Sequence, residues 1–299
     1  MAGTYLKLLI TMTIWGGTWV AGRYAVLEAP PLAIAVWRFL LAAAALLALV
    51  AWRHGGLPRP TRGEWRLIAG LGLTGIFLYN LCFLYGLQRV AAGQGALVVA
   101  LNPVIVTLAA AWIAHERLTP MKALGSAIAL AGSLTVIGHG SPLAPLQGKL
   151  GSGEILIVGC AVLWSAYTLI GRRVTQTLSP LVATAYSSAV GWAMLLAVAL
   201  ADRPAQLVPT YSPLVWTCIL FLALLGTTLG FTWFNQAVAQ IGAARASIFI
   251  NLVPVAAVLQ GAWLLDERLG VPVLVGGGLV LAGVALTQQA SSPLLPEPT

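Results

Sequence analysis

Charged residues are scarce in this chain: Asp, Glu, Lys and Arg make up 8% of its 299 residues, against roughly 25% in an ordinary soluble domain. So few charges cannot form a surface that faces water, which excludes a soluble globular protein. No acidic residue lies near the middle of an apolar run. All eight stand at the end of such a run or in a linker: Glu28, Glu64, Glu116, Glu154, Asp202, Asp266, Glu267 and Glu297. Lipid is therefore expected to cover most of the exterior.

Catalytic and metal-binding motifs are also missing. The apolar runs contain no HExxH, no GxSxG and no pair of Asp residues, which disfavours a membrane-embedded enzyme, the main rival class. Cys82, Cys160 and Cys218 are far apart and form no CxxC or Cys/His cluster, so we interpret them as small buried hydrophobes. We predict no catalytic residue, no metal and no cofactor. A scaffold protein remains an alternative, as does a channel, although a channel would normally need rings of charge or a repeated filter segment.

Long apolar runs dominate what the chain does contain. A membrane-spanning helix needs about 20 predominantly apolar residues, and ten runs come close to that length. They must be helical, because lipid offers no hydrogen-bond partner to the backbone and the runs are too long for barrel strands. The ten predicted spans are 5–26, 32–52, 66–88, 91–114, 119–138, 152–172, 179–200, 213–236, 243–265 and 271–290.

Basic residues outnumber acidic ones, for a net charge of +8, but they lie in short loops and not on one face. This distribution argues against a nucleic-acid partner and instead indicates orientation in the membrane. With the N-terminus in the cytoplasm, most of the basic residues fall on the cytoplasmic side: Lys7, Arg53, Arg59, Arg62, Arg66, Arg117, Lys122, Arg172, Arg173 and Arg245. Both termini are then predicted to be cytoplasmic.

The chain also repeats itself. Residues 83–118 align without a gap on residues 234–269, so that Pro103 meets Pro254 at a separation of 151. The Glu-Arg-Leu triplet that starts at Glu116 likewise meets the one that starts at Glu267. Near the start of each half, Trp15, Gly22 and Arg23 match Trp164, Gly171 and Arg172 at a separation of 149.

Five spans in each half have a geometric consequence: the second half must enter the membrane from the opposite side. The prediction is therefore an all-α integral membrane protein of ten transmembrane helices, built as two inverted five-helix repeats. The repeats are assigned to 1–138 and 152–290, with an extracytoplasmic loop at 139–151 and a disordered cytoplasmic tail at 291–299. Inverted repeats of this kind hold a substrate near the midplane and work by alternating access, so a transporter is indicated.

Three features resemble a known family. They are the segment WGGTWVAGR that begins at Trp15, the sequence Trp37-Arg38-Phe39, and the repeated Pro followed by Glu-Arg-Leu. Together they resemble the drug/metabolite transporter (DMT) superfamily, EamA type, and within it the YddG-like bacterial exporters of aromatic and other neutral amino acids. The resemblance covers essentially the whole chain. It implies efflux of small metabolites across a bacterial inner membrane, with both termini in the cytoplasm.

The chain departs from the small drug exporters of that superfamily, which use a glutamate embedded in their first helix. Residues 5–26 contain no acid, which disfavours a proton-coupled exporter of lipophilic cations. The simplest interpretation is a proton-independent uniporter. The oligomeric state stays open, with a monomer favoured. Which amino acid or metabolite it prefers stays open, and an efflux carrier for another metabolite or drug is the alternative.

Aromatic and amide side chains inside the spans are the candidate substrate-binding residues. Pairs such as Trp15 and Trp19 or Tyr79 and Phe83 are four residues apart and share one helix face. An amide in hydrocarbon must find a partner or meet water. Simple packing between helices is the alternative for each residue. The predicted set is Trp15, Trp19, Tyr79, Asn80, Phe83, Trp164, Tyr167, Trp233, Asn235 and Asn251.

Arg38 lies some six residues inside its span and is the one strong charge that stays away from an interface. It is a candidate charge partner for a substrate carboxylate, or a structural arginine that reaches outward or binds helix-end carbonyls. Glycines and matched prolines permit close helix approach and bending. The predicted hinge and gating residues are Gly16, Gly17, Pro103, Gly226, Gly230 and Pro254.

Overall fold

A computed structural model describes residues 2–113, 119–144, 147, 150–202, 204–208 and 210–289. Within these residues the secondary structure is entirely helical, and the helices form ten consecutive runs, as predicted. Eight of these runs are long and apolar enough to cross a membrane, and Ile248–Leu264 forms a shorter apolar helix. The described residues therefore form an all-α integral membrane protein whose ten helical runs include these eight candidate spans.

The first five runs begin with two uninterrupted helices and end with one, and between them lie two interrupted runs. The elements are α1 (Ala2–Glu28), α2 (Pro31–His54), α3 (Arg62–Leu71) with η1 (Gly72–Leu78) and α4 (Tyr79–Leu87), α5 (Ala92–Val99) with α6 (Asn102–Ile113), and α7 (Pro120–Ile137). Local sequence explains several starts: Pro31 and Pro120 occupy first-turn positions, and the hydroxyls of Thr61 and Thr119 cap α3 and α7.

The second five runs repeat this order. They are α8 (Ser152–Val174), α9 (Pro180–Asp202), α10 (Pro213–Leu220) with η4 (Phe221–Leu229) and α11 (Gly230–Ile241), α12 (Ala243–Ile250) with α13 (Leu252–Leu264), and α14 (Val271–Gln289). A short turn, η3 (Pro204–Leu207), lies between α9 and α10. Each run begins and ends within a few residues of the span predicted for it.

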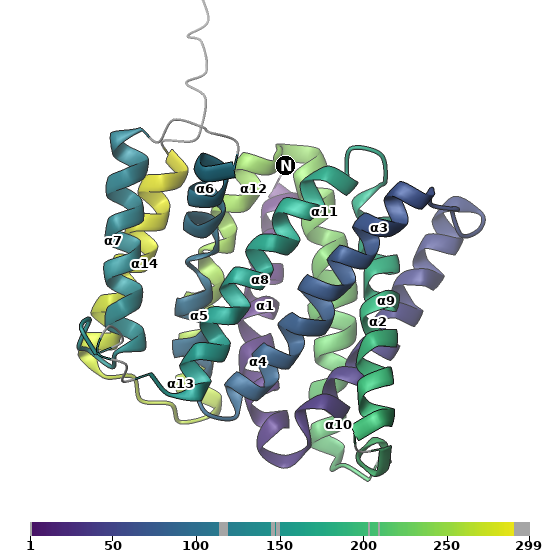
Figure 1. Cartoon of the computed structure of the whole chain (residues 1–299), viewed down its shortest axis with the longest axis horizontal. Helices are drawn as coiled ribbons and strands as arrows, with labels where there is room; N and C mark the ends of the chain where they lie inside the picture. Colours follow the sequence, from purple (N-terminus) through teal and green to yellow (C-terminus); the bar gives the residue numbers. More distant parts are fainter. Residues whose placement is uncertain are drawn as a thin grey trace, which may run out of the picture.

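The inverted relation between the halves is visible in the helix pairs. The first turn of α1 and the last turn of α14 lie at the same edge of the molecule (Figure 1), which we call the terminal edge, and the opposite edge is the distal edge. Helices α7 and α14 pack antiparallel, with Gly125 against Gly283 and Gly132 against Gly276. Because Gly276 and Gly283 are the repeat partners of Gly125 and Gly132, exchanging the halves reproduces the same two contacts.

Both halves contain a π-helical segment that the sequence analysis did not anticipate. It is η1 in the first half and η4 in the second, at matching positions. A side chain from the first helix of the opposite half packs against a glycine in each: Tyr167 against Gly75, and Thr18 against Gly226. In a π-helix the wider turn moves carbonyl groups away from the regular hydrogen bonds between residues four apart. One such carbonyl, Leu222 O, accepts a hydrogen bond of 2.9 Å from the Thr227 hydroxyl, five residues later.

The fourth and ninth runs are interrupted just before their prolines. Helix α5 ends at Val99, four residues before Pro103, and α12 ends at Ile250, four residues before Pro254. Proline has no backbone N–H, and its ring collides with the carbonyl four residues earlier, so the break falls where the missing hydrogen bond would have been. The role of these breaks as hinges stays a prediction.

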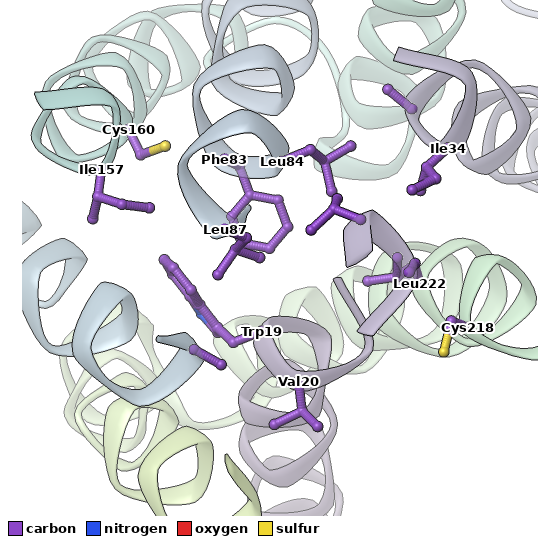
Figure 2. Close-up of a cluster of buried hydrophobic side chains, with 14 of the residues drawn as sticks. Trp19, Val20, Ile34, Phe83, Leu84, Leu87, Ile157, Cys160, Cys218 and Leu222 are labelled. Carbon is purple, nitrogen blue, oxygen red and sulfur yellow. The ribbon is translucent and has the colours of Figure 1, made fainter. Parts of the chain in front are cut away.

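Helix α1 lies at the centre of the bundle, where it contacts helices of both halves, among them α4, α5, α11 and α13. The main hydrophobic core lies along one side of α1 (Figure 2). Trp19 and Val20 of α1 meet Phe83, Leu84 and other buried side chains of α4, α8, α2 and η4. Because other helices surround α1, it does not need a wholly apolar surface, and it can carry polar residues inside the bundle.

Candidate substrate site

Eight aromatic rings from α1, α4, α8 and α11 form one connected group, which we call the aromatic cluster. Its members are Trp15, Trp19, Tyr79, Phe83, Trp164, Tyr167, Phe231 and Phe234. Six of the eight were predicted from the sequence. The structure therefore brings together candidate residues that lie as far as 152 residues apart in the chain.

One branch of the aromatic cluster runs from α1 through α4 to α8. The rings of Trp19 and Phe83 meet edge to face, with centroids 4.9 Å apart. Phe83 and Tyr79 stack at 5.8 Å, and Tyr79 contacts Trp164 at 5.2 Å. Trp164 in turn stacks on Tyr167 at 5.0 Å. Trp19 and Phe83 are buried, whereas Tyr79, Trp164 and Tyr167 are only partly buried, so burial decreases along this branch.

The second branch connects Trp164 with α11 and returns to α1. The centroids of Trp164 and Phe231 are 6.3 Å apart, and those of Phe231 and Trp15 are 5.5 Å apart. Trp15 also contacts Phe234 at 5.3 Å, and its indole N–H donates to Gly226 O at 2.9 Å. All eight rings are partly or fully buried. The aromatic cluster therefore joins the first helix of each repeat to the third helix of each repeat.

Phe231 and Phe234 were missed in the sequence analysis, which selected Trp233 and Asn235 on the same helix. Phe231 and Phe234 are three residues apart and share a helix face, so spacing could have identified the pair. Trp233 and Asn235 do not join the aromatic cluster. Lys7 Nζ lies 5.8 Å from the Trp233 ring centroid near the terminal edge, and Asn235 turns toward a separate cavity.

That cavity has a volume of about 360 Å³ and lies toward the terminal edge, between the end of α2, the start of α9 and the face of α11. It is partly polar. The lining residues are Arg53, His54, Ser179, Pro180, Leu181, Thr232, Asn235, Gln236, Val238 and Ala239. The cavity does not coincide with the aromatic cluster, although both use α11.

Asn251, the remaining predicted amide, also lies apart from the aromatic cluster. Its side-chain N–H donates to Gln288 Oε1 on α14 at 3.1 Å. A partner on a neighbouring helix satisfies the amide, as expected for a polar group inside a bundle. Asn80, in contrast, is buried beside Tyr79, and its side-chain amide donates to Ile76 O at 2.8 Å.

The Arg38 guanidinium contacts both halves of the protein. Its Nη1 donates to Asn80 Oδ1 at 3.0 Å, and its Nη2 donates to Thr227 Oγ1 at 3.4 Å. We call Arg38, Asn80 and Thr227 the polar trio. Among the described residues, the Arg38 guanidinium therefore donates to side chains and to no helix-end carbonyl.

The predicted glycines mark places where α1 approaches its neighbours closely. A side chain at Gly16 would collide with the backbone of α13 at Ala256 and Ala257, and one at Gly230 would collide with Trp15. Gly17 similarly faces Phe221 and Gln260. These contacts explain why small residues are needed for packing. Whether the same positions bend during transport stays a prediction.

Several side chains connect helices at the distal edge. The Glu267 carboxylate accepts hydrogen bonds from the backbone N–H groups of Ala92 at 2.7 Å and Gly93 at 3.1 Å, at the start of α5. Glu28, at the end of α1, accepts from the Ser212 hydroxyl at 2.9 Å. The Arg23 guanidinium donates to Leu87 O. The Arg23 contact bridges α1 and α4 within the first half, whereas the contacts of Glu267 and Glu28 join the two halves.

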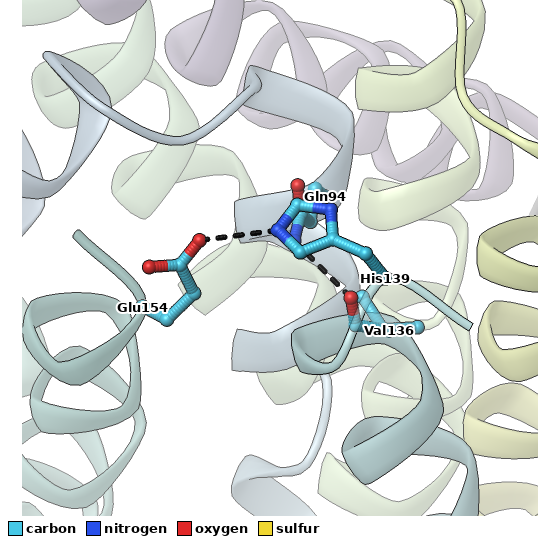
Figure 3. Close-up of polar contacts among 4 residues, drawn as sticks. All are labelled: Gln94, Val136, His139 and Glu154. Atoms are coloured by element: carbon cyan, nitrogen blue, oxygen red, sulfur yellow. Dashed lines mark hydrogen bonds and ion pairs between the residues drawn. The ribbon is translucent and has the colours of Figure 1, made fainter. Parts of the chain in front are cut away.

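A further pair of contacts joins the end of α7 to its neighbours at the same edge (Figure 3). His139 Nε2 lies 3.3 Å from Glu154 Oε1 at the start of α8. The side chain of Gln94 in α5 donates to Val136 O at 3.1 Å. The distal edge is therefore bridged by polar contacts, while the cavity lies toward the terminal edge.

This bundle, with its central aromatic cluster between inverted halves, defines the protein as an α-helical membrane transporter. The EamA-like transporter family matches residues 3–138 and 151–288, and the chain belongs to that family. Its relatives carry transporter or exporter names, which indicate transporters rather than enzymes. A membrane transporter of this kind implies a small-molecule substrate and a lipid bilayer around it.

Two relatives illustrate the range of names in the family. The uncharacterized transporter YyaM of Bacillus subtilis is 32% identical over 286 residues, covering 94% of this chain and 92% of that protein. A probable terminal-alkyne amino-acid exporter of Streptantibioticus cattleyicolor is 27% identical over 282 residues, covering 93% and 91%. A solved crystal structure with 19% identity and a TM-score of 0.64 covers 96% of this chain and shares its fold.

Proposed function

We propose that this protein exports neutral amino acids, aromatic ones among them, and related small metabolites. The observation that carries the proposal is the aromatic cluster, whose rings come from the first and third helices of both repeats. Aromatic rings give a large apolar contact to an amphipathic solute. The relative named as a probable terminal-alkyne amino-acid exporter supports an amino-acid-like substrate.

Transport proceeds by alternating access. The moving units are residues 1–138 and 152–290, joined by the loop at 139–151 and followed by the tail at 291–299. A site shared by both units faces alternate sides of the membrane when one unit rocks against the other. The breaks before Pro103 and Pro254 and the close contacts at Gly16, Gly17, Gly226 and Gly230 are where the bundle adjusts.

The protein acts as a proton-independent uniporter, in which the gradient of the substrate sets the direction. Proton-coupled carriers use a titratable acid inside the membrane, and the acidic residues of this chain lie at span ends or in linkers. It works as a monomer in the bacterial inner membrane. Both termini lie in the cytoplasm, so the terminal edge is the cytoplasmic edge and the distal edge faces outward.

Efflux from cells tests this function. Cells with and without the protein are loaded with labelled phenylalanine, tryptophan, methionine, threonine and a non-amino-acid metabolite, and loss of each label is followed. We expect saturable efflux of neutral amino acids that depends on the protein. Efflux of the unrelated metabolite alone would instead favour a carrier of another class. Non-saturating flux would favour a channel, and the absence of any flux would favour a scaffold.

Proteoliposomes test the coupling. With substrate inside, an imposed pH gradient should leave the initial rate of efflux nearly unchanged, whereas reversal of the substrate gradient should reverse net flux. A tenfold acceleration by protons would contradict uniport while leaving the substrate assignment intact. Valinomycin with equal K⁺ on both sides clamps the membrane potential near zero, so that any remaining effect is due to the pH gradient.

A further inference from the structure

Among the described residues, Arg38 has two hydrogen-bond partners, and both are neutral. They are the side-chain oxygens of Asn80 and Thr227. In the described part of the chain, no Asp or Glu oxygen lies within 4.0 Å of the guanidinium, and buried Nε has no hydrogen-bond partner. A guanidinium carries five N–H donors and keeps its charge. A cation held inside a bundle without an anion is costly, so its retention needs an explanation.

The repeat shows that the fold itself does not require this cation. In the second half, the position that corresponds to Arg38 is Ser187, at a separation of 149. The counterparts of Asn80 and Thr227, at a separation of 151, are Phe231 and Ile76. Helix α2 crosses η4 at Arg38, and the equivalent crossing of α9 with η1 is therefore built without a charge at the matching position. A purely structural arginine would be expected at both crossings, whereas a binding group is needed only once.

The polar trio borders the aromatic cluster. Asn80 is adjacent in sequence to Tyr79, and Thr227 lies four residues before Phe231, on the same face of its helix. Tyr79 and Phe231 both contact Trp164, at 5.2 and 6.3 Å between ring centroids. Arg38 itself is only partly buried. A positive group thus lies beside partly buried members of the aromatic cluster.

We propose that Arg38 binds the carboxylate of the transported substrate, while Asn80 and Thr227 hold the guanidinium in place. The inference rests on the proposed function and names the chemical class that the site selects: a small carboxylate with an apolar or aromatic side chain. Arg recognises a carboxylate through paired N–H donors, and each terminal nitrogen keeps a second N–H beyond its bond to Asn80 or Thr227. The apolar part of the substrate then lies against Tyr79 and Trp164.

This arrangement joins substrate binding to both repeats. Arg38 and Asn80 belong to the first repeat, whereas Thr227 belongs to the second. A carboxylate bound at the polar trio adds the anion that the described part of the site lacks, and it does so where the halves meet. Solutes that keep the aromatic group but lose the carboxylate leave Arg38 without an anion, so they should bind poorly.

Competition against labelled phenylalanine in proteoliposomes tests the inference. The competitors are phenylalanine, 3-phenylpropionate, which keeps the carboxylate and loses the amine, and phenylalaninamide, which loses the carboxylate charge. In the natural protein we expect phenylalaninamide to compete at least tenfold more weakly than phenylalanine. In Arg38→Gln, affinity for phenylalanine should fall at least tenfold, and the discrimination against the amide should disappear.

Two further variants guard against misfolding. Arg38→Lys keeps the charge but loses the paired donors, so it should retain the preference for the carboxylate at reduced affinity. Arg89→Gln removes an exposed arginine that lies two residues beyond the end of α4 and whose guanidinium donates to Tyr85 O, and it should leave discrimination unchanged. Size-exclusion profiles and melting temperatures identify any variant that has not folded.

The outcomes separate the two proposals. If the natural protein takes phenylalanine and its amide equally, the assignment of Arg38 is overturned and the proposed function stands. If labelled 3-phenylpropionate is transported directly, that flux is lost in Arg38→Gln, and no amino acid is transported, Arg38 is supported and the amino-acid function is overturned. If Arg38→Gln folds and keeps the full discrimination against the amide, another group binds the carboxylate. If none of the three compounds competes and labelled phenylalanine is not transported, both proposals fail.

Discussion

Glu267 accepts a hydrogen bond of 2.7 Å from the backbone N–H of Ala92. An acid that lies three residues after the ninth helical run therefore caps the fourth run, which belongs to the other repeat. The same carboxylate accepts from Gly93 at 3.1 Å. The first turn of a helix leaves N–H groups without partners, and an anion there is further stabilised by the helix dipole. The repeat partner, Glu116, lies outside the described residues.

We therefore predict that Glu267→Ala destabilises the protein by about 1 to 2 kcal/mol, the usual cost of losing a helix cap. Asp266→Asn is the matched control, because it removes the neighbouring acid at a left-handed position that Asn tolerates (φ 52°). Thermal unfolding in detergent measures both. Equal melting temperatures for Glu267→Ala and the natural protein would show that the cap contributes nothing to stability.

The aromatic cluster gives the second prediction. Replacing Trp164, Tyr79 or Phe83 with Ala removes apolar contact worth about 1 to 3 kcal/mol. If the ring contacts substrate, transport per folded molecule should fall several-fold, and Trp164→Ala should change the preference between phenylalanine and threonine. Trp52→Ala is the control, since Trp52 is 79% exposed at the end of α2. Both flux and the amount of folded protein are measured.

A purely structural ring would behave differently. Its loss would lower the yield of folded protein and leave the rate per molecule intact. If Trp164→Ala changes neither that rate nor the preference, the substrate site lies elsewhere, and the separate cavity lined by Asn235 and Arg53 becomes the first place to search.

The helix breaks give the third prediction. Ala at 103 or 254 would supply the N–H that proline lacks, so the helix could run continuously from Val99 or Ile250. If the breaks act as hinges, Pro103→Ala and Pro254→Ala should each slow transport while the melting temperature stays equal or rises. Pro120→Ala serves as control, because proline at a first helical turn removes no hydrogen bond. Unchanged transport in both hinge variants would remove the hinge assignment.

Topology gives the fourth prediction. Reporters fused after Thr299 should be cytoplasmic, and reporters inserted near Pro145 should be extracytoplasmic; both positions lie outside the described residues. The odd number of spans between the two positions requires opposite sides. A reporter that is active only in the cytoplasm and another that is active only outside are used at each position. Finding both positions on one side would contradict the predicted orientation of the repeats.

Much of the architecture could be predicted from the sequence, because hydropathy and spacing are local properties. Apolar runs of sufficient length define the ten spans, and an odd number in each half requires inversion. The four-residue spacing of Trp15 and Trp19, and of Tyr79 and Phe83, places each pair on one face of its helix. Even the sites of the breaks follow from proline chemistry at positions 103 and 254.

Only the tertiary structure decided how each helix is rotated about its axis and which neighbour it meets. Sequence spacing could not tell that Phe231 and Phe234 face the other rings while Asn235 faces a cavity, because rotation depends on packing against several helices at once. The π-helical segments arise where Tyr167 and Thr18 press against Gly75 and Gly226. The two neutral partners of Arg38 come from different repeats, so no local pattern could have paired them.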